Sequence, residues 1–393
     1  MERSGRGYMD QAKTCEYIIQ LIRALLTETD PPELPEGISF QDVYKMAKKH
    51  HIRNMCLYAI EKLQNQPDEE LLVKWNKQRT ISSAQSAVQL SERDCIIHAF
   101  SENGIDCLPL KGCLLKEMYP KPEYREMADL DILIRREDEK KVRELMENIG
   151  YKTGKYRAEI HDIYTKDPFV HVEMHMSLLD EERIKRFETI DKSIKLLRDP
   201  WKYAIPTDQP HIYSFSWEDF YLFLIIHLAK HYYSSGTGIR QMMDILIFHQ
   251  NHTIDREMVY QTLRKTSLYD FCKNAEQLVD AWYEEKPLSP ELTEMQDYVF
   301  SSGVYGTQSN GVSHWIEQFE NKYDSEKKAH FMYAFSRIFP SPKVMQNIYP
   351  ILKQYPVFLP GAWIYRLITK SIQNHSKAKN EFKIYIERIK RKK

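Results

Sequence analysis

The sequence lacks the features that mark secreted, membrane-spanning and strongly nucleic-acid-binding proteins. Its 56 Lys and Arg are balanced by 56 Asp and Glu, so no overall positive charge draws it to phosphate backbones. The six cysteines show no CxxC pair or framework spacing, which excludes zinc ribbons and indicates reduced thiols. The first residues are polar, and the longest apolar run, residues 220–229, is far shorter than the roughly 20 residues that cross a bilayer. We therefore expect a globular, cytoplasmic protein.

The pattern of apolar residues divides the 393-residue chain into three regions. Helical spacing predicts helices through residues 1–103. Short apolar runs alternating with helical segments predict a compact α/β core over 104–215, and helical spacing returns over 216–393. The expected fold class is α+β, with a small mixed-sheet core between a helical N-terminal region and a larger helical C-terminal region. Ser39 and Asp42 have capping-box spacing at the start of a helix expected to run through residue 62.

The one strongly charged segment is the C-terminal tail. Residues 370–393 contain nine Lys or Arg and two Glu. Such blocks at a terminus are usually solvated tails. Nucleic acid or an anionic membrane surface is expected as a partner only through this tail.

Two acidic residues alternate with apolar ones in the strand predicted over 128–134. Because strand side chains alternate between faces, Asp129 and Asp131 project to the same side. A second predicted strand, over 169–176, carries Glu173 in a similar pattern, and Glu173 joins the pair if the two strands are neighbours. Clustered carboxylates repel unless a cation lies between them, and carboxylate oxygens are typical magnesium ligands. The alternative is an exposed acidic pair on an edge strand.

The second strand also admits a transition-metal interpretation. His171, Glu173 and His175 share one strand face, and imidazole with carboxylate is a ligand set for zinc or iron. Three ligands on one strand lie nearly in a row rather than around an ion. His175 is therefore expected beside the phosphates or behind the acids.

Polar pairs with helical spacing follow in the C-terminal region. His227 and His231 are four residues apart on one predicted helix, and Arg240 and Asp244 are four apart on the next. The His227–His231 segment lacks the Glu that a metalloprotease helix places after its first His, which argues against a zinc protease. The four side chains form either a buried polar network or a substrate-facing surface.

Several of these residues belong to motifs that occur in a recognisable order. The most specific stretch, residues 108–175, contains in turn Leu110-Lys111-Gly112, Tyr119-Pro120, Arg125, Asp129-Leu130-Asp131-Ile132-Leu133-Ile134 and Gly150-Tyr151. This order resembles the uncharacterised nucleotidyltransferase family of the polymerase-beta-like superfamily. Later blocks of that family are resembled by Glu173, His227, His231, the helix with Arg240 and Asp244, and the region from Phe339-Pro340 to Leu359-Pro360.

The resemblance implies magnesium-dependent nucleotidyl transfer. A nucleoside monophosphate would move from a nucleoside triphosphate, expected to be ATP, to a hydroxyl-bearing acceptor that no residue pattern identifies, and pyrophosphate would leave. Two magnesium ions would stabilise the entering and leaving oxygens. The implied catalytic residues and metal ligands are Asp129, Asp131 and Glu173; the implied nucleotide-binding residues are Lys111, Gly112 and Arg125; the implied substrate-binding residues are His175, His227, His231, Arg240 and Asp244.

The glycine turn departs from the superfamily pattern and leaves other functions open. Cys113 follows Gly112, where a second Gly or a Ser is common, so no hydroxyl is available there for phosphate. One alternative is therefore a catalytically inactive nucleotide-binding or scaffold protein on the same fold. Another is a glycosyltransferase, because an Asp-x-Asp pair also positions a metal on a sugar nucleotide, but the residues before the pair show no βαβ pattern.

Overall fold

The computed structural model describes residues 2–154, 156, 161–179, 194–266, 268–304, 306, 325, 328, 331–332, 335–336, 338–349 and 351–373. The chain forms two compact units. The first comprises Met1–Ala229 and Thr237–Val304, and the second comprises Lys230–Gly236 and Tyr305–Lys393. Residues 374–393, most of the basic tail, lie outside the described residues. The three-region division made from the sequence stays a prediction.

The N-terminal part of the first unit is helical. A capping box starts the second helix, because the backbone N–H of Asp42 donates to Ser39 Oγ over 3.2 Å. The single helix expected to continue through residue 62 is instead two helices. His51 has a left-handed backbone conformation with φ 55° and ends the first of them. The four helices are α1 (Glu2–Leu26), α2 (Phe40–His50), α3 (Arg53–Ile60) and α4 (Glu69–Glu102).

A five-stranded mixed sheet follows, which confirms the α+β fold class. Its strands are β1 (Cys107–Pro109), β2 (Leu130–Ile134), β3 (Lys152–Thr153), β4 (His161–Lys166) and β5 (Val170–His175). They are arranged in the order β1-β2-β5-β4-β3, with β2 and β5 parallel and all other neighbours antiparallel. The connections between them include α5 (Lys111–Met118), α6 (Glu139–Asn148) and short 3-10 helices at Pro122–Tyr124 and Arg136–Asp138.

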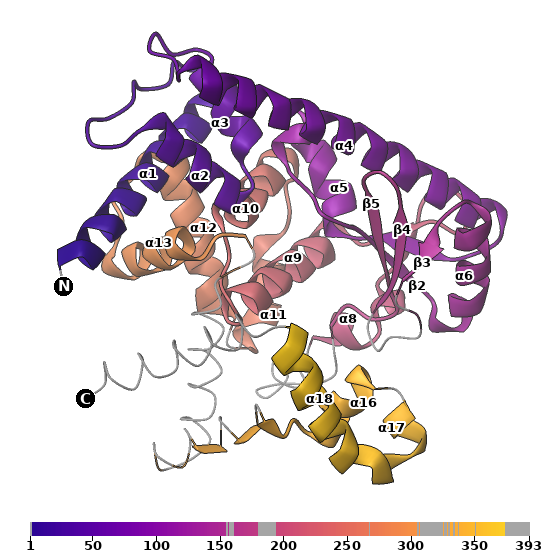
Figure 1. The fold of residues 1–393 in the computed structure, drawn as a ribbon. Helices are drawn as coiled ribbons and strands as arrows, with labels where there is room; N and C mark the ends of the chain where they lie inside the picture. Colours follow the sequence, from indigo (N-terminus) through magenta and orange to yellow (C-terminus); the bar gives the residue numbers. More distant parts are fainter. Residues whose placement is uncertain are drawn as a thin grey trace. The chain divides into compact units, whose positions relative to one another are not determined.

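One face of this sheet packs against an apolar core, and the other carries Asp131, Glu173 and His175 beside the buried Leu133. Figure 1 shows the long helix α4 extending past α5 and the strands. Each fully buried aliphatic side chain contributes on the order of 1.5–3 kcal/mol, so this packing fixes which side chains of β2 and β5 point away from the core. The core cluster includes Ile96 and Phe100 of α4, Leu130, Ile132 and Ile134 of β2, Val142 and Met146 of α6, and Val170, Val172 and Met174 of β5.

The rest of the first unit is mainly helical. Ser216 caps α9, because its Oγ accepts the backbone N–H of Asp219 over 3.1 Å. The helices are α8 (Lys195–Arg198), α9 (Trp217–Tyr232), α10 (Ile239–Asn251), α11 (Arg256–Arg264), α12 (Tyr269–Glu284) and α13 (Pro290–Ser302), with a 3-10 helix at Pro200–Lys202 and a two-stranded ladder of β6 (Ile205–Pro206) and β7 (Tyr213–Ser214). The end of α9, from Lys230 onward, belongs to the second unit.

The described part of the second unit is also helical. The indole of Trp363, in the helix α18 (Leu359–Gln373), donates to the backbone carbonyl of Pro340 over 3.0 Å. This hydrogen bond connects α18 to the turn that precedes the helix α16 (Pro342–Ile348). Across the described residues, none of the helices has the length and apolar character that crossing a membrane requires. The elements are α16 (Pro342–Ile348), α17 (Ile351–Gln354), a 3-10 helix at Pro356–Phe358 and α18 (Leu359–Gln373).

Candidate active site

The pairing of β2 with β5 brings the predicted acids together. Asp131 is directly opposite Glu173 in the parallel register, and neighbouring strands are about 4.8 Å apart. Both side chains point away from the core, because the residues on either side of each belong to the apolar cluster. Asp129 precedes β2 by one residue and is half-buried. The condition set from the sequence, that the two acidic strands be neighbours, is therefore met.

Asp131 is the most deeply held of these acids. Its carboxylate is 3.1 Å from Lys111 Nζ through Oδ2 and 2.8 Å from His175 Nε2 through Oδ1. Burial alone would raise the pKa of Asp131, but the charge of Lys111 and the hydrogen bond from His175 outweigh it and hold that pKa well below the usual range. Burial alone would lower the pKa of His175, yet its hydrogen bonds to Asp131 and Glu173 raise it. Asp131 thus stays ionised, with Lys111 and His175 as its partners.

The surroundings of Asp129 and Glu173 shift the pKa values of these two acids in opposite directions. Burial and the nearby charge of Asp131 raise the pKa of Asp129, although Lys111 acts in the opposite direction. Burial also tends to raise the pKa of Glu173, but the hydrogen bond from His175 and the charge of His161 lower it. Asp129 is therefore the acid whose ionised form is least compensated by its surroundings. A bound cation would relieve this repulsion.

The donor set on this face fits a divalent cation. One ligand atom each from Asp129, His171 and Glu173 lie within 4.8 Å of one another, and so do those of His161, Glu173 and His175. Carboxylate oxygens suit magnesium, whereas imidazole nitrogens suit transition metals. The described residues therefore offer two overlapping groups of ligands that share Glu173.

Lys111 connects the acids to the helical part of the unit. It is the first residue of α5 and begins the turn after β1, where the Leu110 N–H donates to the Asp131 carbonyl over 2.9 Å. Its Nζ also lies 2.9 Å from Nε2 of His227 on α9. The structure therefore groups Lys111 and His227 with the acids. His231 belongs to the segment Lys230–Gly236 of the second unit.

Gly112 is required for close packing at this turn. A Cβ added there would lie 2.6 Å from the sulfur of Met127 and 3.3 Å from Nη1 of Arg125, distances too short for an ordinary contact. Arg125 is 5% exposed, and its Nη1 has no hydrogen-bond partner among the described residues. The glycine thus lets the segment before β2 lie directly against α5.

Arg125 and Asp244 form a buried ion pair. The guanidinium Nε and Nη2 of Arg125 donate to Asp244 over 2.8 and 2.9 Å, and the hydroxyl of Tyr119 donates to the same carboxylate over 2.8 Å. The charge of Asp244 outweighs burial and raises the pKa of Arg125 above its usual range. Arg240 and Asp244 of α10 were both predicted to bind substrate. In the structure, Asp244 positions Arg125.

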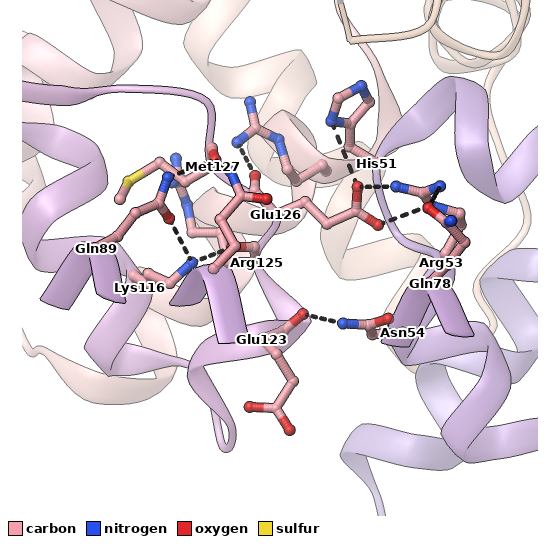
Figure 2. A network of polar contacts seen from close by, with 12 residues as sticks. His51, Arg53, Asn54, Gln78, Gln89, Lys116, Glu123, Arg125, Glu126 and Met127 are labelled. Carbon is pink, nitrogen blue, oxygen red and sulfur yellow. Dashed lines mark hydrogen bonds and ion pairs between the residues drawn. The ribbon is translucent and has the colours of Figure 1, made fainter. Parts of the chain in front are cut away.

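The segment from the 3-10 helix Pro122–Tyr124 to β2 is held by side chains from four helices, which Figure 2 shows in part. Such contacts satisfy buried carbonyls of a segment that makes no ladder of its own. The segment leads directly to Asp129, so the contacts fix where β2 begins. The donors are Asn54 to the Glu123 carbonyl (2.8 Å), Lys116 to that of Arg125 (3.0 Å), Arg240 to that of Glu126 (2.7 Å) and Gln89 to that of Met127 (3.0 Å).

Glu126 adds a charged clamp to the same segment. Its carboxylate accepts from both Nε and Nη2 of Arg53, over 3.1 and 2.8 Å, and such bidentate pairs are among the strongest in proteins. His51 lies 3.7 Å from the same carboxylate. The sequence predicts Arg240 as a substrate-binding residue but does not reveal this network. The available signal was polar residues on otherwise apolar helix faces, such as Asn54 and Lys116.

Comparison with known proteins supports the fold and the reaction class. The model of a family described as uncharacterised nucleotidyltransferase matches residues 36–284, more than half of the 393 residues. No curated protein and no solved structure matched the chain. The matched span includes the described acids, Lys111 and α10, whereas the likeness noted beyond residue 284 stays a prediction.

Buried Lys116 should give the folded protein a specific pH dependence. Burial and the positive charges of Arg125 and Arg240 lower its pKa to about 7, against about 10.4 in the unfolded chain. Between these values the unfolded chain binds the extra proton, so Lys116 makes stability rise with pH by up to about 1.4 kcal/mol per unit. We expect Lys116→Met to remove this rise between pH 7 and 10 in denaturant unfolding. The exposed Lys140→Met should parallel wild type; parallel curves for Lys116→Met would contradict the assignment.

Loss of Asp244 should destabilise the first unit strongly. Asp244→Asn leaves the Arg125 guanidinium buried without its counter-charge, and we expect a loss of about 3–5 kcal/mol in the free energy of unfolding. Urea titration measures this. Asp167→Asn is the control, because it breaks the exposed pair of Asp167 with Lys152 and should cost less than about 1 kcal/mol. Equal, small losses in both variants would show that the buried pair is not structural.

Proposed function

The chain belongs to the uncharacterised nucleotidyltransferase family, and on that premise we propose that it moves a nucleoside monophosphate from a nucleoside triphosphate to a hydroxyl-bearing acceptor, releasing pyrophosphate. The observation that carries the proposal is the register of β2 with β5, which sets Asp131 opposite Glu173 on the polar face. ATP is the first nucleotide to test. The identity of the acceptor is not part of this proposal.

The metal ligands in this proposal are Asp129, Asp131 and Glu173. Their oxygens suit magnesium, and two bound ions would supply charge stabilisation for the entering and leaving oxygens. The chain's own contribution is to hold these carboxylates close together and to keep Asp131 ionised. Asp131 fits this role because Lys111 and His175 keep its pKa low.

Lys111 is proposed to bind the triphosphate. Its Nζ pairs with Asp131 at 3.1 Å and contacts His227 at 2.9 Å, so it is an ammonium already directed at the acidic face. A triphosphate oxygen can replace the carboxylate as its partner once a divalent cation takes over Asp131. Arg125, with Nη1 beside Gly112, is proposed to donate to a second phosphate oxygen.

The proposed reaction is an in-line displacement at the α-phosphorus. The acceptor oxygen forms a bond to phosphorus, and the bond from phosphorus to the bridging oxygen breaks, so the electron pair leaves with pyrophosphate. The hydroxyl proton passes to a carboxylate oxygen of the polar face. We propose that His227 and Arg240 contribute to substrate binding around this face, while His175 orients Asp131 and Glu173. The substrate-binding role expected for His231, which belongs to the other unit, stays a prediction.

One observation favours nucleotide binding without transfer as a second candidate. Cys113, in the position where the superfamily often has a hydroxyl, is fully buried and its thiol donates to the Asp131 carbonyl over 3.4 Å. Burial also raises the pKa of this thiol to about 12. Cys113 therefore supports the strand rather than contacting phosphate. Magnesium-dependent nucleotide binding with no transfer to any acceptor would favour this candidate.

Transfer should depend on the ionised carboxylate of Asp131. We expect wild type with Mg²⁺, α-labelled nucleotides and cell extract to label an acceptor and release pyrophosphate, and chelation to stop both. Asp131→Asn keeps the shape but loses the charge, so its rate should fall on the order of 10²–10³-fold, the usual cost of one transition-state stabiliser. Asp167→Asn, in the exposed turn between β4 and β5, should react as wild type does. Equal labelling by wild type and Asp131→Asn would refute the mechanism.

A further inference from the structure

The polar face of the sheet also carries two imidazoles around Glu173. His161 on β4 is paired in register with His175 on β5, and Glu173 lies two residues before His175 on the same side of β5. The Nε2 atoms of His161 and His175 are each 3.5 Å from Glu173 Oε2. The two rings lie 5.0 Å apart, centroid to centroid. Three donors therefore converge from two adjacent strands.

This grouping differs from the one considered in the sequence. There, His171, Glu173 and His175 would have lain in a row along one strand. In the structure His161 comes from the neighbouring strand, so the three donors form a triangle, while His171 groups with Asp129 and Glu173. A triangle leaves a common centre for an ion, which a row does not.

We propose that His161, Glu173 and His175 form a binding site for a divalent first-row transition-metal ion. Two imidazole nitrogens and one carboxylate oxygen on one side of an ion are a recurring set for such metals, with open positions for water or substrate. Magnesium, by contrast, prefers oxygen ligands. The site goes beyond the proposed transfer reaction, shares only Glu173 with its metal ligands, and does not require turnover.

The donor spacing is close to what a bound ion needs. Metal–nitrogen distances of about 2.0–2.1 Å place neighbouring ligand atoms roughly 3.0–3.4 Å apart. The two histidine-to-Glu173 distances, both 3.5 Å, require shifts of only a few tenths of an ångström. Asp131 Oδ1 lies 2.8 Å from His175 Nε2, and this contact gives way when that nitrogen binds the ion.

Access and anchoring also suit an exchangeable ion. The side chains of His161 and Glu173 are 26% and 21% exposed, whereas that of His175 is 9% exposed. Solvent therefore reaches two of the three ligands, and the third is fixed in the sheet. The strands hold all three on backbone positions set by ladder hydrogen bonds, which favours a preformed site over one assembled from loops.

The test uses Co²⁺ as a visible probe on the full chain after chelation of bound metals. Excess Mg²⁺ is kept present to occupy sites made of oxygen alone, and no nucleotide is added. We expect wild type to retain Co²⁺ by equilibrium dialysis and to show visible absorption. His161→Ala should weaken Co²⁺ binding at least about tenfold, since even outer-shell changes commonly cost 10–100-fold. His98→Ala, an exposed imidazole on α4, is the matched control and should bind as wild type does.

Thermal unfolding separates metal binding from folding. In chelator, His161→Ala and wild type should melt alike, whereas Co²⁺ should raise the Tm of wild type and of His98→Ala only. If His161→Ala fails to fold, His161→Gln takes its place. Electron spin-echo spectroscopy of Mn²⁺-loaded wild type should then show nitrogen coupling from histidine. Complete loss of Co²⁺ to excess Mg²⁺, equal Co²⁺ affinity in His161→Ala, or Mn²⁺ with no nitrogen coupling would each overturn the proposal.

The outcome is independent of the transfer assay. Asp129→Asn leaves the three proposed ligands intact, so it should keep Co²⁺ binding while losing transfer. A protein that binds Co²⁺ through His161 but transfers no nucleotide would retain this inference and contradict the proposed function. A protein that transfers nucleotide with Mg²⁺ but does not bind Co²⁺ would support the proposed function and contradict this inference.

Discussion

The electrostatic repulsion among carboxylates on one face of a small sheet is the constraint on which this protein's site depends. Asp131 and Glu173 are neighbours across β2 and β5, and Asp129 adds a third acid at the start of β2. Without cations this arrangement would be unfavourable in a partly buried position. Lys111 supplies positive charge to Asp131, and His175 supplies a hydrogen bond. In the proposed function, these partners of Asp131 are exchanged for a metal ion and phosphates.

Much of the surrounding structure holds that face in place. The segment before β2 contributes its carbonyls to side chains from α3, α4, α5 and α10, and the ion pair of Arg125 with Asp244 is buried beside it. Buried charges of this kind cost desolvation energy and add little net stability. Their effect is instead to fix the position of Asp129 and the turn at Gly112. Preorganisation of this sort is what electrostatic stabilisation of a transition state requires.

The sequence was sufficient to predict features that depend only on residues close together in the chain. Alternation along two short strands predicted which acids share a face, and capping spacing predicted the start of α2 at Ser39. The break at His51 was missed, because a single left-handed residue leaves the apolar spacing unchanged. Side-chain pairs such as Lys111 with Asp131 could not be predicted from the sequence either, since they depend on how distant segments pack. His161 was overlooked because only the pairing of β4 with β5 brings it next to His175.

We propose that a triphosphate and a divalent ion meet on the face formed by Asp129, Asp131 and Glu173. The most direct measurement is electron–nuclear double resonance of Mn²⁺ bound to the protein with a non-hydrolysable nucleoside triphosphate analogue. We expect ³¹P coupling to the ion in wild type and its loss when Asp131 is replaced by Asn. Mn²⁺ bound with no ³¹P coupling, or coupling unchanged in that variant, would contradict it.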